Sequence, residues 1–182
     1  MMKGVLLVTL MATLVATTAY AEDSKTYLIG EFGSAKYENM YTFPNPGAIG
    51  LGVGLHFDEY LAAELGYTIF GDSTANVPGG SATVKASSFH PALVGRLPFN
   101  DKFNLLGKFG WAFNRGKKDG ATVPSWGSDS VSNNTIYYAF GAQYNVSKQV
   151  GLRVQYERFG KFENKSPAMT ASSIAAGIVF NL

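Results

Sequence analysis

The chain has 182 residues, of which 46% are apolar and only 15% are charged, against roughly 25% charged residues in a typical soluble domain. It contains no cysteine, which excludes a disulfide-stapled miniprotein, a lipoprotein anchored through an N-terminal cysteine and any thiolate metal site. A formal net charge of +2 argues against nucleic-acid binding, because such proteins need a concentrated basic face. We expect no cofactor and no metal ion.

The first residues have the pattern of an export signal. Lys3 supplies a short positive region, residues 4–15 form an apolar run, and Ala19 and Ala21 are the small residues that a signal peptidase recognises. The apolar run is too short to cross ~30 Å of hydrocarbon comfortably as an anchor. We therefore predict a cleaved signal peptide at residues 1–21 and a single domain at residues 22–182.

The rest of the chain alternates apolar and small or polar residues with a period of two, which is typical of strands. No later run approaches the 18 uninterrupted apolar residues of a membrane helix. The alternation predicts eight strands, an even number that is able to close antiparallel. The predicted strands cover residues 25–36, 49–57, 61–69, 84–97, 103–113, 136–145, 152–157 and 173–182.

The composition of the second face distinguishes a soluble barrel or sandwich from a membrane barrel. In the third predicted strand, Leu61, Leu65 and Ile69 alternate with Glu64 and Thr68, and the second face of most strands is rich in Gly, Ala and Ser. A surface in water would carry many more charges, whereas small residues suit the narrow lumen of eight strands. We predict an all-β, eight-stranded antiparallel up-and-down transmembrane β-barrel, with its apolar face toward lipid.

The connections and the aromatic residues support the same fold. Short links at residues 58–59, 98–102 and 145–149 alternate with long polar links near residues 37–46, 71–83, 114–134 and 160–170. Short periplasmic turns and long outer loops are typical of bacterial outer-membrane barrels. Aromatic residues near the strand ends predict two interfacial girdles. On the turn side these are Phe57, Phe99, Phe103, Tyr144 and Phe180, and on the loop side Tyr67, Phe89, Trp111, Phe113, Tyr138, Tyr156 and Phe159.

Three segments carry a resemblance to a known family: residues 60–67 (YLAAELGY, followed by Phe70-Gly71), residues 143–156, and the C-terminal residues 177–182 (GIVFNL). In these the chain resembles the transmembrane domain of OmpA and its small eight-stranded, OmpX-like relatives. The resemblance implies insertion into the outer membrane by the barrel-assembly machinery, through a C-terminal signal at Gly177, Phe180 and Leu182, where leucine replaces the usual aromatic residue. OmpA continues into a peptidoglycan-binding domain, and because this chain stops at its last strand no such domain is expected.

The same resemblance implies an interior charge network. Glu64 matches a buried acid of the family and Arg153 the arginine that pairs with it, while Arg96 matches a gating lysine. The predicted network consists of Glu31, Glu64, Arg96, Lys108, Gln143 and Arg153, with Gln143 in place of a second acid. Independently of the family, charges in a narrow lumen must be paired or hydrogen-bonded, and here they would plug the bore. The alternative is a set of packing salt bridges without any role in transport.

An enzymatic role finds little support in the sequence. The only histidines are His56 and His90, and Ser88 shares a face with His90, but same-face spacing alone is weak support for a catalytic pair. Pro91 is unusual in a closed barrel and predicts either a bulge or a later start of its strand; a lateral opening for lipid is a further alternative. We predict a protein that is not an enzyme.

The sequence favours a structural role in envelope integrity, with a plugged lumen and with loops exposed for interaction. The alternatives are a small-solute or ion pore and a lipid-modifying enzyme. The expected partners are outer-membrane lipid or lipopolysaccharide and a surface ligand that the sequence does not name, whereas nucleic acid is excluded. Loop bases that would contact lipopolysaccharide phosphates, or alternatively keep the loops soluble, are Arg115, Lys117, Lys118, Lys161 and Lys165.

Overall fold

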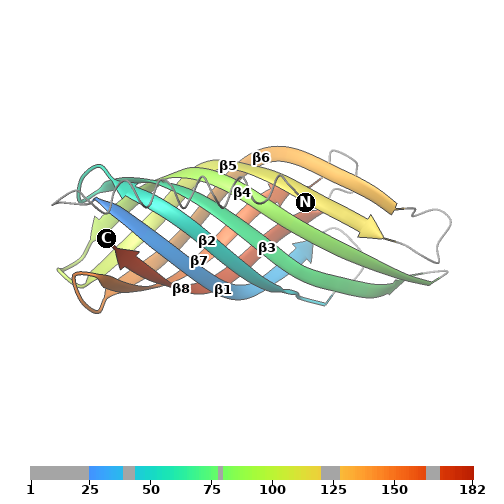
Figure 1. Cartoon of the computed structure of the whole chain (residues 1–182), viewed down its shortest axis with the longest axis horizontal. Helices are drawn as coiled ribbons and strands as arrows, with labels where there is room; N and C mark the ends of the chain where they lie inside the picture. The colour runs from blue at the N-terminus through green and yellow to red at the C-terminus, as the bar shows by residue number, and fades with distance from the viewer. Residues whose placement is uncertain (1–24, 39–43, 78–79, 120–127, 163–168) are drawn as a thin grey trace.

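A computed structural model describes residues 25–38, 44–77, 80–119, 128–162 and 169–182. Eight strands form one closed antiparallel barrel in which each strand pairs with its neighbours in sequence and β1 pairs with β8 (Figure 1). The strands are β1 (Thr26–Glu38), β2 (Gly47–His56), β3 (Leu61–Val77), β4 (Gly80–Pro98), β5 (Phe103–Asp119), β6 (Ser128–Asn145), β7 (Val150–Lys161) and β8 (Thr170–Asn181). The predicted fold class is confirmed. The predicted signal peptide lies outside the described residues.

No described helix is long and apolar enough to cross a membrane.

The two faces of the strands are as the period-two pattern predicts. Large apolar side chains such as Phe32, Ile49 and Ile174 are 64–71% exposed on the outside, which is the arrangement of a surface solvated by lipid. Most of the predicted girdle residues are also exposed or half-buried on this surface. Phe159 is the exception, because it has the same parity as Arg153 and Glu157 and is fully buried in the lumen. Its assignment to the girdle was wrong.

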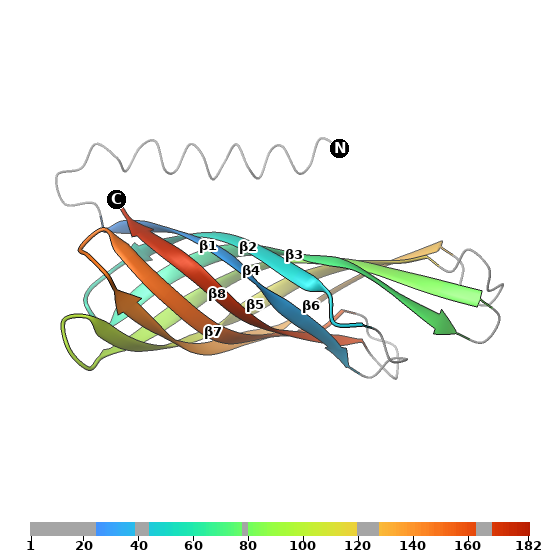
Figure 2. The same ribbon diagram turned by 90° about the horizontal axis from the view of Figure 1, so that it is seen from below.

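Four strands are much longer than a membrane crossing requires. β3 to β6 have 17 to 19 residues, whereas a membrane-spanning strand needs about 9–11. They extend beyond the other strands at one end of the barrel, called the loop end below; the opposite end is the turn end (Figure 2). The predicted loops at residues 71–83 and 114–134 are therefore mostly strand, since backbone hydrogen bonding continues where the sequence has already become polar.

Pro91 interrupts the ladder without shifting it. Pro91 pairs with Leu65 of β3, and the register with β5 is the same on both sides of it, from Phe89 opposite Phe113 to Ala92 opposite Gly110. β4 also begins before Pro91, so both predicted explanations, a bulge and a later start, were wrong. In the described strands the register shifts instead within β3, between residues 70 and 73, and within β7, between residues 158 and 160.

Glycines on the lumen face make room for large side chains from neighbouring strands. A Cβ added at Gly54 would lie 2.0 Å from the ring of Tyr27, and one at Gly66 would lie 2.1 Å from the ring of His90. Contacts this short are far inside van der Waals separation, so neither ring could keep its place. The glycine-rich face that predicted a narrow lumen is the surface into which the interior side chains pack.

Candidate functional site

The charged network lies in the lumen toward the turn end and centres on Glu64 of β3. Lys108 of β5 donates to Glu64 Oε1, Arg153 Nη1 of β7 donates to Oε2 at 2.8 Å, and the Tyr27 hydroxyl donates to Oε2 at 2.8 Å. Arg153 also donates through Nε and Nη2 to the side-chain oxygen of Gln143. Glu64, Lys108, Gln143 and Arg153 are all buried. The structure thus joins four of the six residues of the predicted network around a single carboxylate.

The other two residues of the predicted network lie apart. Arg96 is half-buried, and its Nη1 lies 3.2 Å from His56 Nδ1. Glu31 is buried and accepts one hydrogen bond, of 3.1 Å, from the amide of Gln155, while its Oε1 has no hydrogen-bond partner among the described residues. Both basic side chains of the fully buried set are therefore directed to Glu64, and neither forms an ion pair with Glu31.

A third interior carboxylate, Glu157 of β7, was not singled out from the sequence. It accepts hydrogen bonds from the Tyr137 hydroxyl at 2.6 Å and from Ser173 Oγ at 3.0 Å. Glu157 has the same parity as Arg153, so period-two counting alone would have placed it in the lumen. Its neutral partners satisfy the carboxylate without a cation.

Apolar clusters border the polar layer at both ends. The turn-end cluster consists of Tyr27, Ile29, Ala62, Val94, Leu106 and Val179. At the loop end, a larger cluster includes Tyr37, Phe70, Tyr137, Phe159, Phe162 and Met169. Within it Phe70 and Phe159 meet edge to face at 5.0 Å between ring centroids, a preferred aromatic geometry. The polar groups of the lumen thus pack among these two apolar clusters.

The two histidines each pack against a tyrosine ring. His90 stacks on Tyr137 with ring centroids 4.6 Å apart, and its Nε2 lies 3.0 Å from Thr68 Oγ1. Ser88 Oγ is buried with no hydrogen-bond partner among the described residues, so the same-face pair Ser88–His90 is not hydrogen-bonded. The ring of His56 lies beside that of Tyr27 at the turn end.

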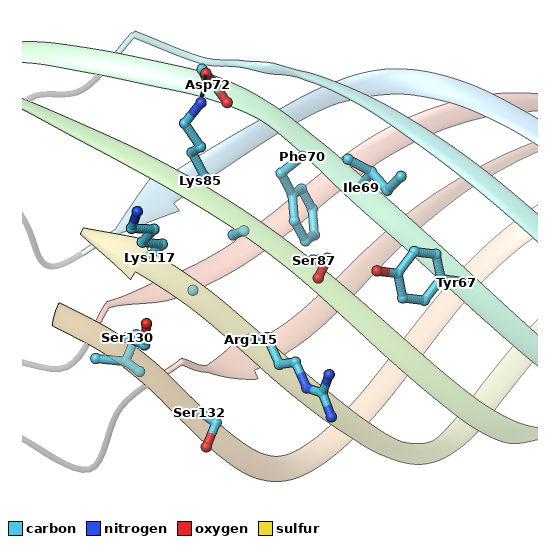
Figure 3. Close-up of a pocket in the computed structure, with 13 residues that line it drawn as sticks. Tyr67, Ile69, Phe70, Asp72, Lys85, Ser87, Arg115, Lys117, Ser130 and Ser132 are labelled. Carbon is cyan, nitrogen blue, oxygen red and sulfur yellow. Dashed lines mark ion pairs between the residues drawn. The ribbon is translucent and has the colours of Figure 1, made fainter. Parts of the chain in front are cut away.

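The predicted lipopolysaccharide contacts lie on different walls. Arg115 and Lys117 of β5 are exposed on the outside of the barrel, and Lys118 follows them in the same strand. Lys161 is exposed at the end of β7, on a different part of the barrel wall, and Lys165 lies outside the described residues. Only Arg115 and Lys117 of this set line a depression of about 540 Å³ over β3 to β6 (Figure 3).

The predicted C-terminal assembly signal lies at the end of the last strand. Gly177 faces the lumen beside Glu31, where an added Cβ would come within 2.7 Å of Glu31 Cγ. Phe180 is exposed on the outer surface, and the Leu182 amide donates to the Thr26 carbonyl at 3.0 Å. That bond secures the end of β8 to β1 at the barrel seam.

Comparisons with known proteins agree with the architecture. The pattern of the outer membrane protein beta-barrel domain family matches residues 5–181. A search of curated proteins finds no match.

Solved structures show the same fold. Neisserial surface protein A (NspA) superimposes with a TM-score of 0.70 at 15% identity, covering 87% of this chain and 98% of NspA. Ail of Yersinia pestis, in complex with the heparin analogue sucrose octasulfate, gives 0.59 at 16% identity, covering 86% and 97%. The outer membrane enzyme PagL gives 0.52 at 14% identity, covering 86% and 99%. The chain belongs to the outer membrane protein beta-barrel domain family and is an eight-stranded barrel of the cell outer membrane.

Proposed function

We propose that this protein is a non-conducting structural barrel of the outer membrane, with the hairpins of its loop end exposed outside the cell for interaction. The observation that carries the proposal is the position of Glu64, held by Lys108 and Arg153 in the buried lumen toward the turn end. Eight strands leave an interior just wide enough to be filled by side chains. Ion pairs between strands and the buried aromatic cluster of the loop end are then expected to leave no continuous aqueous path.

Recordings in planar lipid bilayers test the closed lumen. The purified, refolded protein is expected to give no discrete conductance steps, while a wide porin added to the same membrane does. Steps that disappear in Glu64→Gln or Arg96→Gln would instead establish the alternative, an ion or small-solute pore gated by these charges.

The proposal includes no catalytic step. His90 is buried between Tyr137 and Phe159, beyond the reach of a lipid in the membrane, and it has no hydrogen bond to Ser88. A general base must come within hydrogen-bond reach of the proton it removes. Mass spectra of lipid A from cells with and without the protein are expected to be identical, and a change abolished by His90→Ala would contradict this.

A further inference from the structure

The depression on the outer wall combines an apolar floor with a basic rim, and it carries the inference. Its outward-facing lining residues, together with Phe89 and Phe113 beside it, follow the ladder in three successive levels. Nearest the barrel centre, Tyr67, Phe89 and Phe113 are aligned across β3, β4 and β5. Two residues farther along each strand, Ile69, Ser87, Arg115 and Ser132 are aligned, and Lys85, Lys117 and Ser130 follow.

The change from aromatic to basic residues takes place over a short distance. Two residues along a strand span about 7 Å, so Arg115 lies one such step above the aromatic level and Lys117 two steps above it. Aromatic residues at barrel ends prefer the depth of lipid headgroups. The basic residues therefore lie where phosphate groups of a lipid would be, and the aromatic level lies where its acyl chains begin.

The charges of the depression favour an anion. Three basic side chains, Lys85, Arg115 and Lys117, line it against one acid, Asp72. Asp72 pairs with Lys85 at 2.6 Å, whereas Arg115 and Lys117 have no acidic partner among the described residues (Figure 3). Ser87 and Ser132 lie on either side of Arg115 in the ladder and add hydroxyl donors. Guanidinium and hydroxyl donors around one hollow suit phosphate oxygens.

We propose that this depression binds the phosphorylated headgroup of an outer-leaflet glycolipid such as lipid A, whose acyl chains lie against Tyr67, Phe89 and Phe113. The volume of about 540 Å³ is that of a small-molecule site, and its lining residues Arg115, Lys117 and Ser132 are exposed on the outside of the barrel. The inference rests on the proposed orientation of the loop end and is independent of whether the lumen conducts.

Native mass spectrometry of the refolded protein with diphosphorylated lipid A tests the site. Arg115→Gln/Lys117→Gln is expected to weaken binding roughly 30-fold, since each base near an anionic surface contributes about 1 kcal/mol. The matched control, Lys36→Gln/Lys148→Gln, removes two exposed charges from β1 and from the turn between β6 and β7, and is expected to leave affinity within about twofold. Ser87→Phe, which fills the hollow without changing charge, is expected to reproduce the loss.

Three results would overturn the proposal: an equal loss in the control variant, which indicates diffuse attraction; unchanged binding of dephosphorylated lipid A; or equal affinity for inorganic phosphate. Planar-bilayer recordings of the same preparations report separately on the closed lumen, so failure of one proposal is distinguishable from failure of the other.

Discussion

Glu64 is the residue on which the ion pairs of the lumen converge. It accepts from two cations and a tyrosine hydroxyl, whereas Glu31, also buried, accepts only from an amide. The loss of one member of a buried ion pair leaves an uncompensated charge, while a carboxylate without a cationic partner is costly to bury in the first place. Glu64 and Glu31 should therefore respond differently to neutralisation.

Glu64→Gln is expected to destabilise the barrel by about 3–5 kcal/mol, because Lys108 and Arg153 would remain buried without a counter-ion. Glu31→Gln retains a side-chain carbonyl that can accept from Gln155, so its free energy of unfolding should stay within about 1 kcal/mol of the parent or rise. Urea unfolding in lipid vesicles, followed by heat-modifiable gel migration, measures both. Equal destabilisation by the two variants would contradict the assignment of Glu64 as the centre.

Two glycines, Gly54 in the lumen and Gly107 on the outer face, predict a second contrast. Gly54→Ala forces the Tyr27 ring away from Glu64 and is expected to cost about 1–3 kcal/mol through overpacking. Gly107→Ala is the matched control, because an added Cβ there meets nothing within 4 Å, and its free energy of unfolding should change by less than about 1 kcal/mol. The same unfolding assay applies, and a Gly54→Ala variant as stable as the control would show that Tyr27 is not confined.

At the scale of elements, the sequence predicts the strand face on which a side chain lies better than it predicts the position of that side chain along the barrel axis. Period-two alternation correctly assigns Glu64, Lys108 and Arg153 to the lumen. It does not give their heights, which depend on the stagger between strands. In the ladder Val94 lies opposite Lys108, so Arg96 lies two residues, about 7 Å, nearer the turn end and meets His56 instead of Glu64.

The length of the long hairpins could not be predicted either, and the physical reason differs from the one for the position of Arg96. Polar composition at residues 71–83 indicates a loop, yet backbone pairing needs no apolar side chains, and β3 and β4 stay paired as far as Val77 and Gly80. Alternation does persist there, with Ser73 and Ala75 buried and Thr74 exposed, and this was the available signal.

Because this extension lies beyond the apolar band, it should be dispensable for folding. Replacing residues 74–83 by Asn-Gly joins the paired residues Ser73 and Val84 through a two-residue turn of the type favoured in hairpins. The shortened barrel is expected to remain heat-modifiable, with a free energy of unfolding within about 2 kcal/mol of the parent. A protein that no longer refolds into vesicles would show that the extension takes part in closing the barrel.

At the scale of the whole molecule, the barrel reverses the distribution of apolar and polar side chains that a soluble protein has. Apolar side chains face outward to lipid, and buried polar and charged side chains line the lumen among two apolar clusters. Function then depends on whether that interior is sealed from water on the side of the exposed hairpins, which burial of Phe159, Phe162 and Met169 supports.

The chain contains no cysteine, so a single introduced thiol reports this directly. Ser88→Cys places a thiol of nearly the same size in the lumen, where Ser88 is fully buried, and Ser132→Cys places one on the exposed outer wall. In folded protein in vesicles, a small methanethiosulfonate reagent should modify the Ser132→Cys variant within minutes and leave the Ser88→Cys variant unmodified until it is denatured. Comparable modification rates for the two folded variants would contradict a sealed lumen.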